Sequence, residues 1–440
     1  MTRAAPAAGA HYRDRVTSAL LTDHYELTML QACLADGTAS RRSVFEVFAR
    51  SLPGGRRYGV VAGTARVLDA IQAFRFSPAQ LDWLASSGVV DRATCDYLAD
   101  YRFAGDVDGY PEGEMYFPHS PVLTVEATFA EAVVLETVVL SILNHDCAIA
   151  SAASRMSLAA GNRPCIEMGS RRTHEAAAVS AARAAYVAGF ESTSNLGAGH
   201  LFGIPTRGTS AHAFTLVHDS EQAAFASQVA ALGAGTTLLV DTYDVTRGVA
   251  TAVAVAGTDL GGVRLDSGDL IEQAARVRRQ LDELGATGTR IVVTSDLDEH
   301  AIAALAAAPV DGYGVGTYLV TGSGAPTARM VYKLVAREDA DGVMVDVEKR
   351  SRGKTGAGGR KTAARRLHDG VAVAEVVRVH ADGGRHDERP LQVPLVRRGE
   401  VVQPEGLERA RARHREAVAE LPEKARKLSA GQPAIPTTRG

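Results

Sequence analysis

Residues 237–317 decide the fold, because they carry four short apolar runs at roughly 22–28-residue intervals: TLLVD (237–241), GVRLD (262–266), RIVVTSD (290–296) and GYGVGT (312–317). These runs are rich in β-branched residues, as buried strands are. The segments between them, such as DLIEQAARVRRQLDELG (269–285) and DEHAIAALAAAP (298–309), space their apolar residues as helices do. Strands that alternate with helices are joined by right-handed crossovers and form a parallel sheet. The sequence therefore predicts an α/β fold.

Acidic residues and glycines stand where these predicted strands end. Functional groups collect at the carboxyl ends of parallel strands, and here those ends carry Asp241, Asp266 and Asp296. Aspartate also caps helices, which explains one or two of them. Carboxylates gathered near a phosphate site suggest Mg²⁺ bridged to a polyphosphate, or stabilisation of a cationic transition state. The glycines of GYGVGTYLVT (312–321) are typical of a phosphate cradle, whereas the sequence contains no P-loop motif.

The composition is that of a globular protein. A chain of 440 residues, 46% hydrophobic and 22% charged, is long enough for two or three domains or a large barrel with attachments. The net charge of -3 is unevenly placed, with +7 in residues 341–440 and -10 in residues 1–340. The basic excess concentrates in KRSRGKTGAGGRKTAARR (349–366), which predicts a solvated loop, with a nucleic-acid patch or an anion clamp as alternatives. Its glycines and the acidity of the rest make nucleic acid the least favoured partner.

Compartment signals point to the cytoplasm. The four cysteines are scattered without a CxxC pair, which predicts neither a metal knuckle nor a disulfide framework and fits a reducing environment. Residues 1–15 lack the apolar core of a signal peptide. The long apolar segment 122–144 contains Glu131 and Glu136, so we expect a buried structural helix and no membrane span.

Two further stretches carry residues suited to binding anions. RGTSAH (207–212) thins to small side chains just before His212, and Thr209 offers a hydroxyl without bulk. IEMGSRRTH (166–174) contains Arg171, and arginine makes bidentate contacts to carboxylate or phosphate. Taken alone, the first stretch is more typical of a strand-to-loop transition with a surface histidine. The second is equally typical of an exposed charge pair at a helix start.

Nine motifs, taken in chain order, resemble those of the nicotinate phosphoribosyltransferase family: LLTDHYELTM (20–29), FEVFAR (45–50), EMGSRRTH (167–174), GFESTSNLGAG (189–199), GTSAH (208–212), DTYD (241–244), VRLDSGD (263–269), TSDLDE (294–299) and GVGTYLVT (314–321). The resemblance runs from about residue 20 to about residue 335. Each motif alone is a weak signal, but nine in the family's order are specific.

The resemblance implies an irregular (β/α) barrel of the type II phosphoribosyltransferase kind. An N-terminal α/β domain (1–125) would precede the catalytic α/β barrel (126–340), and a C-terminal region with the basic loop (341–440) would pack alongside. The implied reaction joins nicotinate to phosphoribosyl pyrophosphate and gives nicotinate mononucleotide and pyrophosphate, within NAD salvage. It also implies coupled ATP hydrolysis, a requirement for Mg²⁺ and a homodimer.

Carried over motif by motif, the resemblance assigns two catalytic residues and a set of substrate contacts. His212 matches the histidine that ATP phosphorylates, and Asp241 matches the carboxylate that holds its imidazole. Tyr25 matches the aromatic residue that covers the pyridine ring, often from the neighbouring subunit. The remaining matched positions are assigned to nicotinate, ribose, pyrophosphate and the 5′-phosphate: Met168, Arg171, Ser194, Thr209, Arg264, Asp266, Ser267, Gly268, Gly316 and Thr317.

Two positions bear on which pyridine is used. Related nicotinamide phosphoribosyltransferases carry an aspartate where this chain has Ser194; a carboxylate there repels nicotinate, whereas a serine hydroxyl donates to it. Met168 stands where many relatives have an aromatic residue, and methionine also packs against ring faces. We therefore expect the acid to be preferred to the amide. The alternatives are nicotinamide or quinolinate specificity on the same scaffold, and a non-catalytic metabolite-binding barrel.

Overall fold

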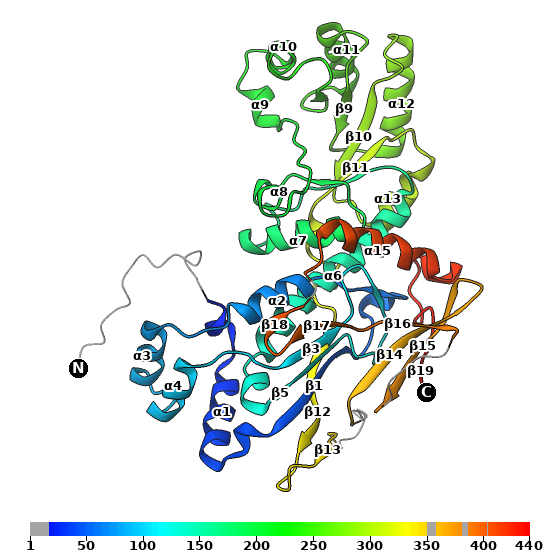
Figure 1. Ribbon diagram of the computed structural model, residues 1–440. Helices are drawn as coiled ribbons and strands as arrows, with labels where there is room; N and C mark the ends of the chain where they lie inside the picture. The colour runs from blue at the N-terminus through cyan, green and yellow to red at the C-terminus, as the bar shows by residue number, and fades with distance from the viewer. Residues whose placement is uncertain (1–16, 350–357, 381–385, 403) are drawn as a thin grey trace.

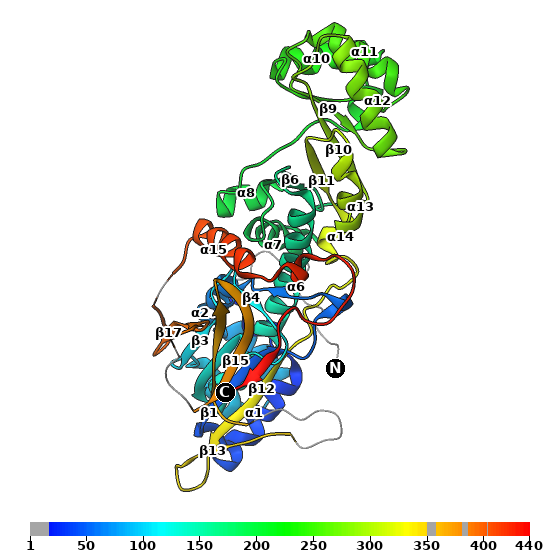
Figure 2. The ribbon, with the colours of Figure 1, turned by 90° about the vertical axis from the view of Figure 1, so that its right-hand side faces the viewer.

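The computed structural model describes residues 17–349, 358–380, 386–402 and 404–440. Residues 350–357, most of the first half of the predicted basic loop, lie outside the described residues. The prediction of a solvated loop is wrong for residues 361–366, which belong to strand β14 (Lys361–His368) with Lys361 and Arg365 buried, because these cations pair with carboxylates of neighbouring strands. Figure 1 shows a parallel sheet with its helices above an antiparallel sheet, with helix α6 (Glu136–Ala160) between them. The turned view in Figure 2 shows an elongated molecule with α10 to α12 at one end and α1 at the other.

The upper sheet contains the predicted strands. Its six strands are parallel to their neighbours. Their order is β7 (Ser192–Thr193), β6 (Cys165–Glu167), β11 (Gly312–Val315), β10 (Arg290–Ser295), β9 (Gly262–Leu265) and β8 (Thr237–Leu239). β7 and β8 are the two ends of this order, so the sheet is an open half-barrel. The predicted α/β class and irregular barrel are confirmed.

Helices connect these strands, and the aspartates between strand and helix fall into two groups, those that cap a helix and those that do not. Asp244, Asp269 and Asp298 each accept a backbone N–H bond in the first turn of the following helix. Capping therefore uses the second aspartate after each strand. The expectation that capping explains one or two of Asp241, Asp266 and Asp296 is wrong, and these first aspartates are available at the strand ends. The helices of this part are α7 (Glu175–Val187), α8 (Leu196–Phe202), α9 (His212–Leu216), α10 (Glu221–Leu232), α11 (Val245–Ala256), α12 (Leu270–Glu283), α13 (Glu299–Ala304) and α14 (Thr317–Val320).

The lower sheet collects strands from three distant parts of the chain. Its order is β13 (Met344–Asp346), β12 (Met330–Glu338), β1 (Arg42–Ala49), β5 (Leu123–Thr128), β3 (Asp106–Gly109), β17 (Val393–Arg397) and β18 (Glu400–Val401). The division at residues 125 and 340 stays a prediction. Sheet pairing crosses both boundaries, because β12 and β17 pair with strands of the N-terminal segment.

Smaller elements complete the lower part. A C-terminal sheet has the order β16 (Glu388–Pro390), β14 (Lys361–His368), β15 (Val371–Val379) and β19 (Thr437–Arg439), and β2 (Gly59–Val60) pairs with β4 (Met115–Tyr116). The helices are α1 (His24–Asp36), α2 (Thr64–Gln72), α3 (Pro78–Ser86), α4 (Arg92–Ala99), α5 (Phe129–Val133) and α15 (Leu407–Glu420). Short 3₁₀ turns lie at Ala19–Leu21, Thr38–Ser40, Pro53–Gly55, Leu305–Ala307 and Glu423–Arg426.

The long apolar helix is part of the core. By length and composition alone, Phe129–Ala160 could cross a membrane, but 67% of its most apolar window is buried inside the protein. Its α6 portion contacts α7 and α13 of the upper part and α2 and β12 of the lower part. The segment is a buried structural helix, as the sequence predicts, and it joins the two sheets.

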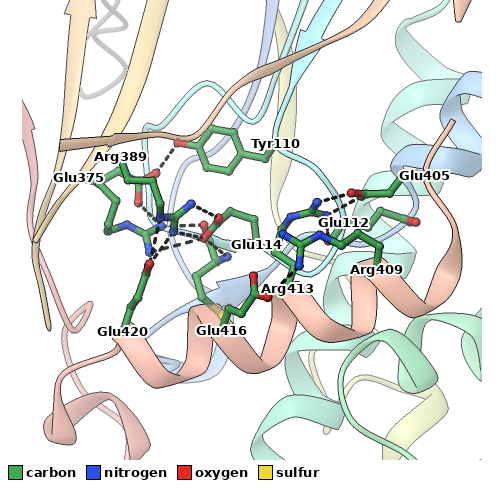
Figure 3. Close-up of polar contacts among 12 residues, drawn as sticks. Tyr110, Glu112, Glu114, Glu375, Arg389, Glu405, Arg409, Arg413, Glu416 and Glu420 are labelled. Atoms are coloured by element: carbon green, nitrogen blue, oxygen red, sulfur yellow. Dashed lines mark hydrogen bonds and ion pairs between the residues drawn. The ribbon is translucent and has the colours of Figure 1, made fainter. Parts of the chain in front are cut away.

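An ion network attaches the C-terminal strands and α15 to the rest. Arg365 is fully buried, with Nη2 3.3 Å from a carboxylate oxygen of Glu375 and Nη1 3.7 Å from one of Glu114. Figure 3 shows Arg389 between Glu114 and Glu420, at N–O distances of 2.7 and 2.6 Å. Because Glu114 precedes β4 while the arginines come from β14 and β16, the network holds the C-terminal region alongside the N-terminal sheet.

Candidate active site

His212 lies at the acidic ends of the parallel strands. It is the first residue of α9, and 41% of its side chain is exposed. Its Nδ1 is 3.1 Å from the hydroxyl of Thr242, and its Nε2 is 3.9 Å from a carboxylate oxygen of Asp266. The structure thus brings the histidine of RGTSAH to the strand tips that carry the predicted carboxylates.

Asp241 is placed differently from its predicted role. We expected its carboxylate to hold the imidazole of His212. Instead, one oxygen, Oδ2, accepts hydrogen bonds from the backbone N–H of Asp266 at 2.8 Å and from the Ser267 hydroxyl at 2.9 Å. The physical reason is the pairing of β8 with β9, which presents the N–H of the neighbouring strand end to this carboxylate. In this structure Thr242 and Asp266 are the groups beside the ring.

Two threonines that the sequence analysis did not select position these groups. Thr242 contacts His212, and the hydroxyl of Thr294 donates to Oδ1 of Asp266, which leaves Oδ2 facing the imidazole. Both threonines belong to motifs that carry an aspartate, DTYD and TSDLDE. A hydroxyl beside a strand-end carboxylate is the signal that could have found them.

Arg264 holds the loop that leads to His212. Its Nη1 donates to the Thr209 hydroxyl and, at 3.0 Å, to the backbone carbonyl of Ser210. Burial lowers the pKa of Arg264, the carboxylates of Asp266 and Asp241 oppose that shift, and Arg171 adds to it. An arginine stays charged under such a shift, so two cations, Arg264 and the exposed Arg171, face the same region.

The other side of the site is formed where β6, β7 and β11 end. The N–H of Met168 donates to Val315 at 2.8 Å, and a Cβ on Gly314 would meet the Met168 sulfur at 2.7 Å. Only glycine therefore leaves room for this side chain over the strand. Ser194 is exposed at the end of β7. The hydroxyl of Thr317 is 3.2 Å from Asp296, next to Gly316 at the start of α14.

Gly268 completes the DSGD turn. It has a φ of +79°, a backbone conformation that favours glycine over residues with a side chain. The turn places Ser267 against Asp241 and Asp269 at the cap of α12.

Tyr25 lies far from the other predicted site residues within a single chain. It lies on α1, at the opposite end of the molecule from β9 and β10 (Figures 1 and 2). It is 45% exposed, and burial with the nearby Glu136 and Glu26 raises its pKa to about 12. Tyr25 is thus a neutral phenol that presents part of its ring to the outside of the chain.

Comparisons with known proteins agree with the motif order. A family model described as the nicotinate phosphoribosyltransferase (NAPRTase) N-terminal domain matches residues 20–144. The Mycobacterium tuberculosis protein named nicotinate phosphoribosyltransferase pncB1 is 58% identical over 430 residues, which cover 95% of this chain and 94% of the relative. A second protein of that organism, nicotinate phosphoribosyltransferase pncB2, is 41% identical and covers 93% of this chain and 89% of its own length.

Solved structures show the same fold. The crystal structure of human nicotinic acid phosphoribosyltransferase has a TM-score of 0.81 at 27% identity and covers 94% of this chain and 96% of its own. A nicotinate-nucleotide pyrophosphorylase from Pyrococcus furiosus, at 24% identity and a TM-score of 0.77, shares the fold over 96% of this chain and 99% of its own. With this extent of identity and coverage, the chain belongs to the nicotinate phosphoribosyltransferase family.

Proposed function

We propose that this enzyme couples ATP hydrolysis, through a phosphohistidine at His212, to the reaction of its family. In that reaction nicotinate and phosphoribosyl pyrophosphate give nicotinate mononucleotide and pyrophosphate, a step of NAD salvage. The observation that carries the proposal is the placement of a part-exposed imidazole between Thr242 and Asp266 at the strand tips. A non-catalytic barrel would have no use for a nucleophile there.

The surroundings of His212 suit attack on a phosphoryl group. A neutral imidazole has a ring nitrogen with a free lone pair, which can act as the nucleophile. It attacks the γ-phosphorus of ATP, and the bond to ADP breaks. The Asp266 carboxylate, 3.9 Å away, stabilises the imidazolium that forms. Gly208 and Ala211 are exposed small residues, and they leave space for the phosphoryl group.

Transfer to nicotinate takes place at the same strand tips. The pyridine nitrogen attacks C1 of the ribose as pyrophosphate leaves, through an oxocarbenium-like state that the carboxylates of Asp241 and Asp266 stabilise. Arg264 and Arg171 orient the anionic groups. Gly316 and Thr317 hold the 5′-phosphate at the end of β11, the usual position for a phosphate in such folds.

The oxygen ligands present fit Mg²⁺ shared with a pyrophosphate. Asp241 Oδ1 is buried and has no hydrogen-bond partner in the part of the chain that the structure describes. That part contains no cluster of three His, Cys, Asp or Glu residues, and Mg²⁺ needs only one or two carboxylates when substrate phosphates supply the rest. Asp241 and Asp266 would hold the ion, which would neutralise charge on the leaving group.

Labelled ATP tests the phosphohistidine directly. Incubation with γ-labelled ATP is expected to leave an acid-labile, base-stable phosphate on the peptide that contains His212. Loss of that label on addition of nicotinate and phosphoribosyl pyrophosphate would link it to turnover. Product formation without any such label would refute the coupling and leave the transferase activity standing.

A homodimer would bring Tyr25 to the site. Among the exposed apolar side chains, which are spread over the chain, one group lies on the N-terminal segment around α1 and another lies around α8 and α9 beside the site. The first group is Leu20, Leu21, Tyr25 and Met29, and the second is Leu196, Leu201, Leu216, Val217 and Tyr243. In an antiparallel dimer with a two-fold axis, the α1 end of each subunit would lie against the α8 and α9 region of the other. Both groups would then be covered, and Tyr25 of one subunit would lie over the pyridine pocket of the other.

Complementation between variants tests the shared site. Tyr25→Ala and His212→Ala are each expected to lose ATP-stimulated activity. Co-expressed in equal amounts, they should regain about a quarter of the wild-type sites, because half of the dimers then carry one intact site. The measurement is the ATP-stimulated rate of co-purified protein. No recovery in a verified mixed dimer would place Tyr25 outside the neighbouring site.

The choice between acid and amide is tested at Ser194. Ser194→Asp should shift the nicotinate-to-nicotinamide ratio of kcat/KM toward the amide by at least about tenfold, because like charges then meet in the pocket. Ser194→Ala, which removes the hydroxyl without adding charge, is the matched control and should shift the ratio less. A Ser194→Asp enzyme that selects the acid as strongly as before would show that specificity lies elsewhere.

A further inference from the structure

Glu167 is a buried carboxylate whose side-chain hydrogen bonds go to residues beside the site. It is the last residue of β6 and is 0% exposed. Its side chain accepts hydrogen bonds from the backbone N–H of Gly169 and from the hydroxyl of Thr193, and its backbone carbonyl accepts the N–H of Ser194 at 2.8 Å. One residue therefore bonds to the loop after β6 and to the loop after β7.

Thr193 extends these contacts toward the histidine loop. Its hydroxyl, while donating to Glu167, also accepts the N–H of Asn195 at 2.9 Å. Its backbone carbonyl accepts the N–H of Arg207, the first residue of RGTSAH, at 2.9 Å, and its N–H donates to the carbonyl of Pro205 at 3.0 Å. The Asn195 side chain then donates to Ser170 at 2.9 Å, which closes a ring of contacts between the two loops.

Close packing restrains the loop after β6 in addition to these hydrogen bonds. A Cβ on Gly169 would lie 2.2 Å from a Val320 methyl and 3.2 Å from the carbonyl of Gly316. Gly169 can therefore approach α14 only because it has no side chain, and its N–H is then directed at Glu167. Burial raises the pKa of Glu167, and the bonds from Thr193 and Gly169 oppose that shift.

We propose that Glu167 is a positioning residue that sets the distance between Met168 and Arg171 on one loop and Ser194 on the other, and thereby the affinity for nicotinate. The inference rests on the proposed function in one respect, the placement of the pyridine between these loops. Glu167 itself touches no substrate. Its carboxylate is the common acceptor without which each loop would settle separately.

Alanine and glutamine substitutions of Glu167 distinguish the effect of its hydrogen bonds from the effect of its negative charge. Glu167→Ala is expected to raise the KM for nicotinate by about tenfold, as loss of a hydrogen bond to a charged group does. The KM for phosphoribosyl pyrophosphate should rise less than that for nicotinate, because the Thr317–Asp296 contact does not involve Glu167 and Glu167 reaches Gly316 only through the packing of Gly169. Glu167→Gln should recover most of the nicotinate affinity, since its amide can accept from Gly169 and donate to Thr193.

Two further variants keep the test valid if Glu167→Ala folds poorly. Thr193→Val removes one donor with little change of shape, and it should raise the nicotinate KM about threefold or more. Glu375→Gln is the matched control: this carboxylate is also fully buried but belongs to the C-terminal ion network, so it should lower thermal stability while the nicotinate KM stays unchanged.

Three outcomes would overturn the proposal: an unchanged nicotinate KM in Glu167→Ala and Thr193→Val, an equal rise of both KM values, or a Glu167→Gln enzyme as impaired as Glu167→Ala. None of these depends on ATP coupling or on Ser194. If Glu167→Ala changes the nicotinate KM while Ser194→Asp leaves selectivity unchanged, the positioning role stands and only the assignment of Ser194 fails.

Discussion

His212→Ala is expected to lower the rate of ATP hydrolysis by the enzyme at least about a thousandfold, while a slower ATP-independent formation of nicotinate mononucleotide persists. The imidazole is the acceptor of the phosphoryl group in the proposed cycle, and alanine offers no nucleophile in its place. The pyridine nitrogen, the ribose and the groups that orient them do not depend on this side chain. The ratio of ATP hydrolysed to product formed, measured at saturating substrates, checks the expectation.

His218 provides the matched control for this variant. It lies shortly after α9, and its Nδ1 contacts the carbonyl of Phe214 at 2.7 Å, so it is a structural histidine of the same segment. His218→Ala should keep ATP hydrolysis coupled to product formation. ATPase activity that survives in His212→Ala would refute the assigned role, and equal loss in both variants would point to a general disturbance of α9.

Arg365→Leu is expected to lower the free energy of unfolding by about 3–5 kcal/mol, the cost of leaving buried charges uncompensated. Arg365 is fully buried, and the Glu375 and Glu114 carboxylates beside it are at most 1% exposed. Removal of the guanidinium leaves the two carboxylates facing each other without a shared cation. Urea denaturation monitored by circular dichroism measures the change.

A double variant distinguishes charge from packing. Arg365→Leu combined with Glu375→Gln removes one charge of each sign, so it should be more stable than Arg365→Leu alone. Arg92→Leu breaks an exposed helical pair with Asp96 and should cost less than about 1 kcal/mol. If Arg365→Leu also lowers the free energy of unfolding by less than about 1 kcal/mol, the network does not stabilise the fold and contributes only to the specificity of packing.

Local patterns predicted the parallel part of the fold well, because each strand and helix there is signalled by its own residues. The runs from 237 to 317 became β8 to β11. The lower sheet was less accessible to sequence reasoning. Its pairing of β1 with β12 joins residues nearly three hundred positions apart, and the sequence of neither strand identifies the strand with which it pairs.

The candidate site shows the same division between local and long-range information. Motif order selected His212, Asp241 and Asp266, but it paired the imidazole with Asp241, whereas the structure places Asp266 beside the ring. The partner of Asp241 is a backbone N–H of the adjacent strand, which the sequence does not reveal. Tyr25 matches a family motif and yet lies at the far end of its own chain from the strand tips. The dimer proposed above would explain this, because a contact between subunits has no signature within one sequence.

The sheet order has a consequence for biosynthesis. All strands of the parallel sheet lie between residues 165 and 315, so that sheet can assemble as soon as this stretch has left the ribosome. The lower sheet begins with β1 at residue 42 but waits for β17 near residue 393. During synthesis β5 is already flanked by β1 and β3, but the outer edge of β1 stays open until β12 is made and that of β3 until β17 is made. We therefore expect the N-terminal segment to be the part of this enzyme that is most exposed to wrong pairing during translation.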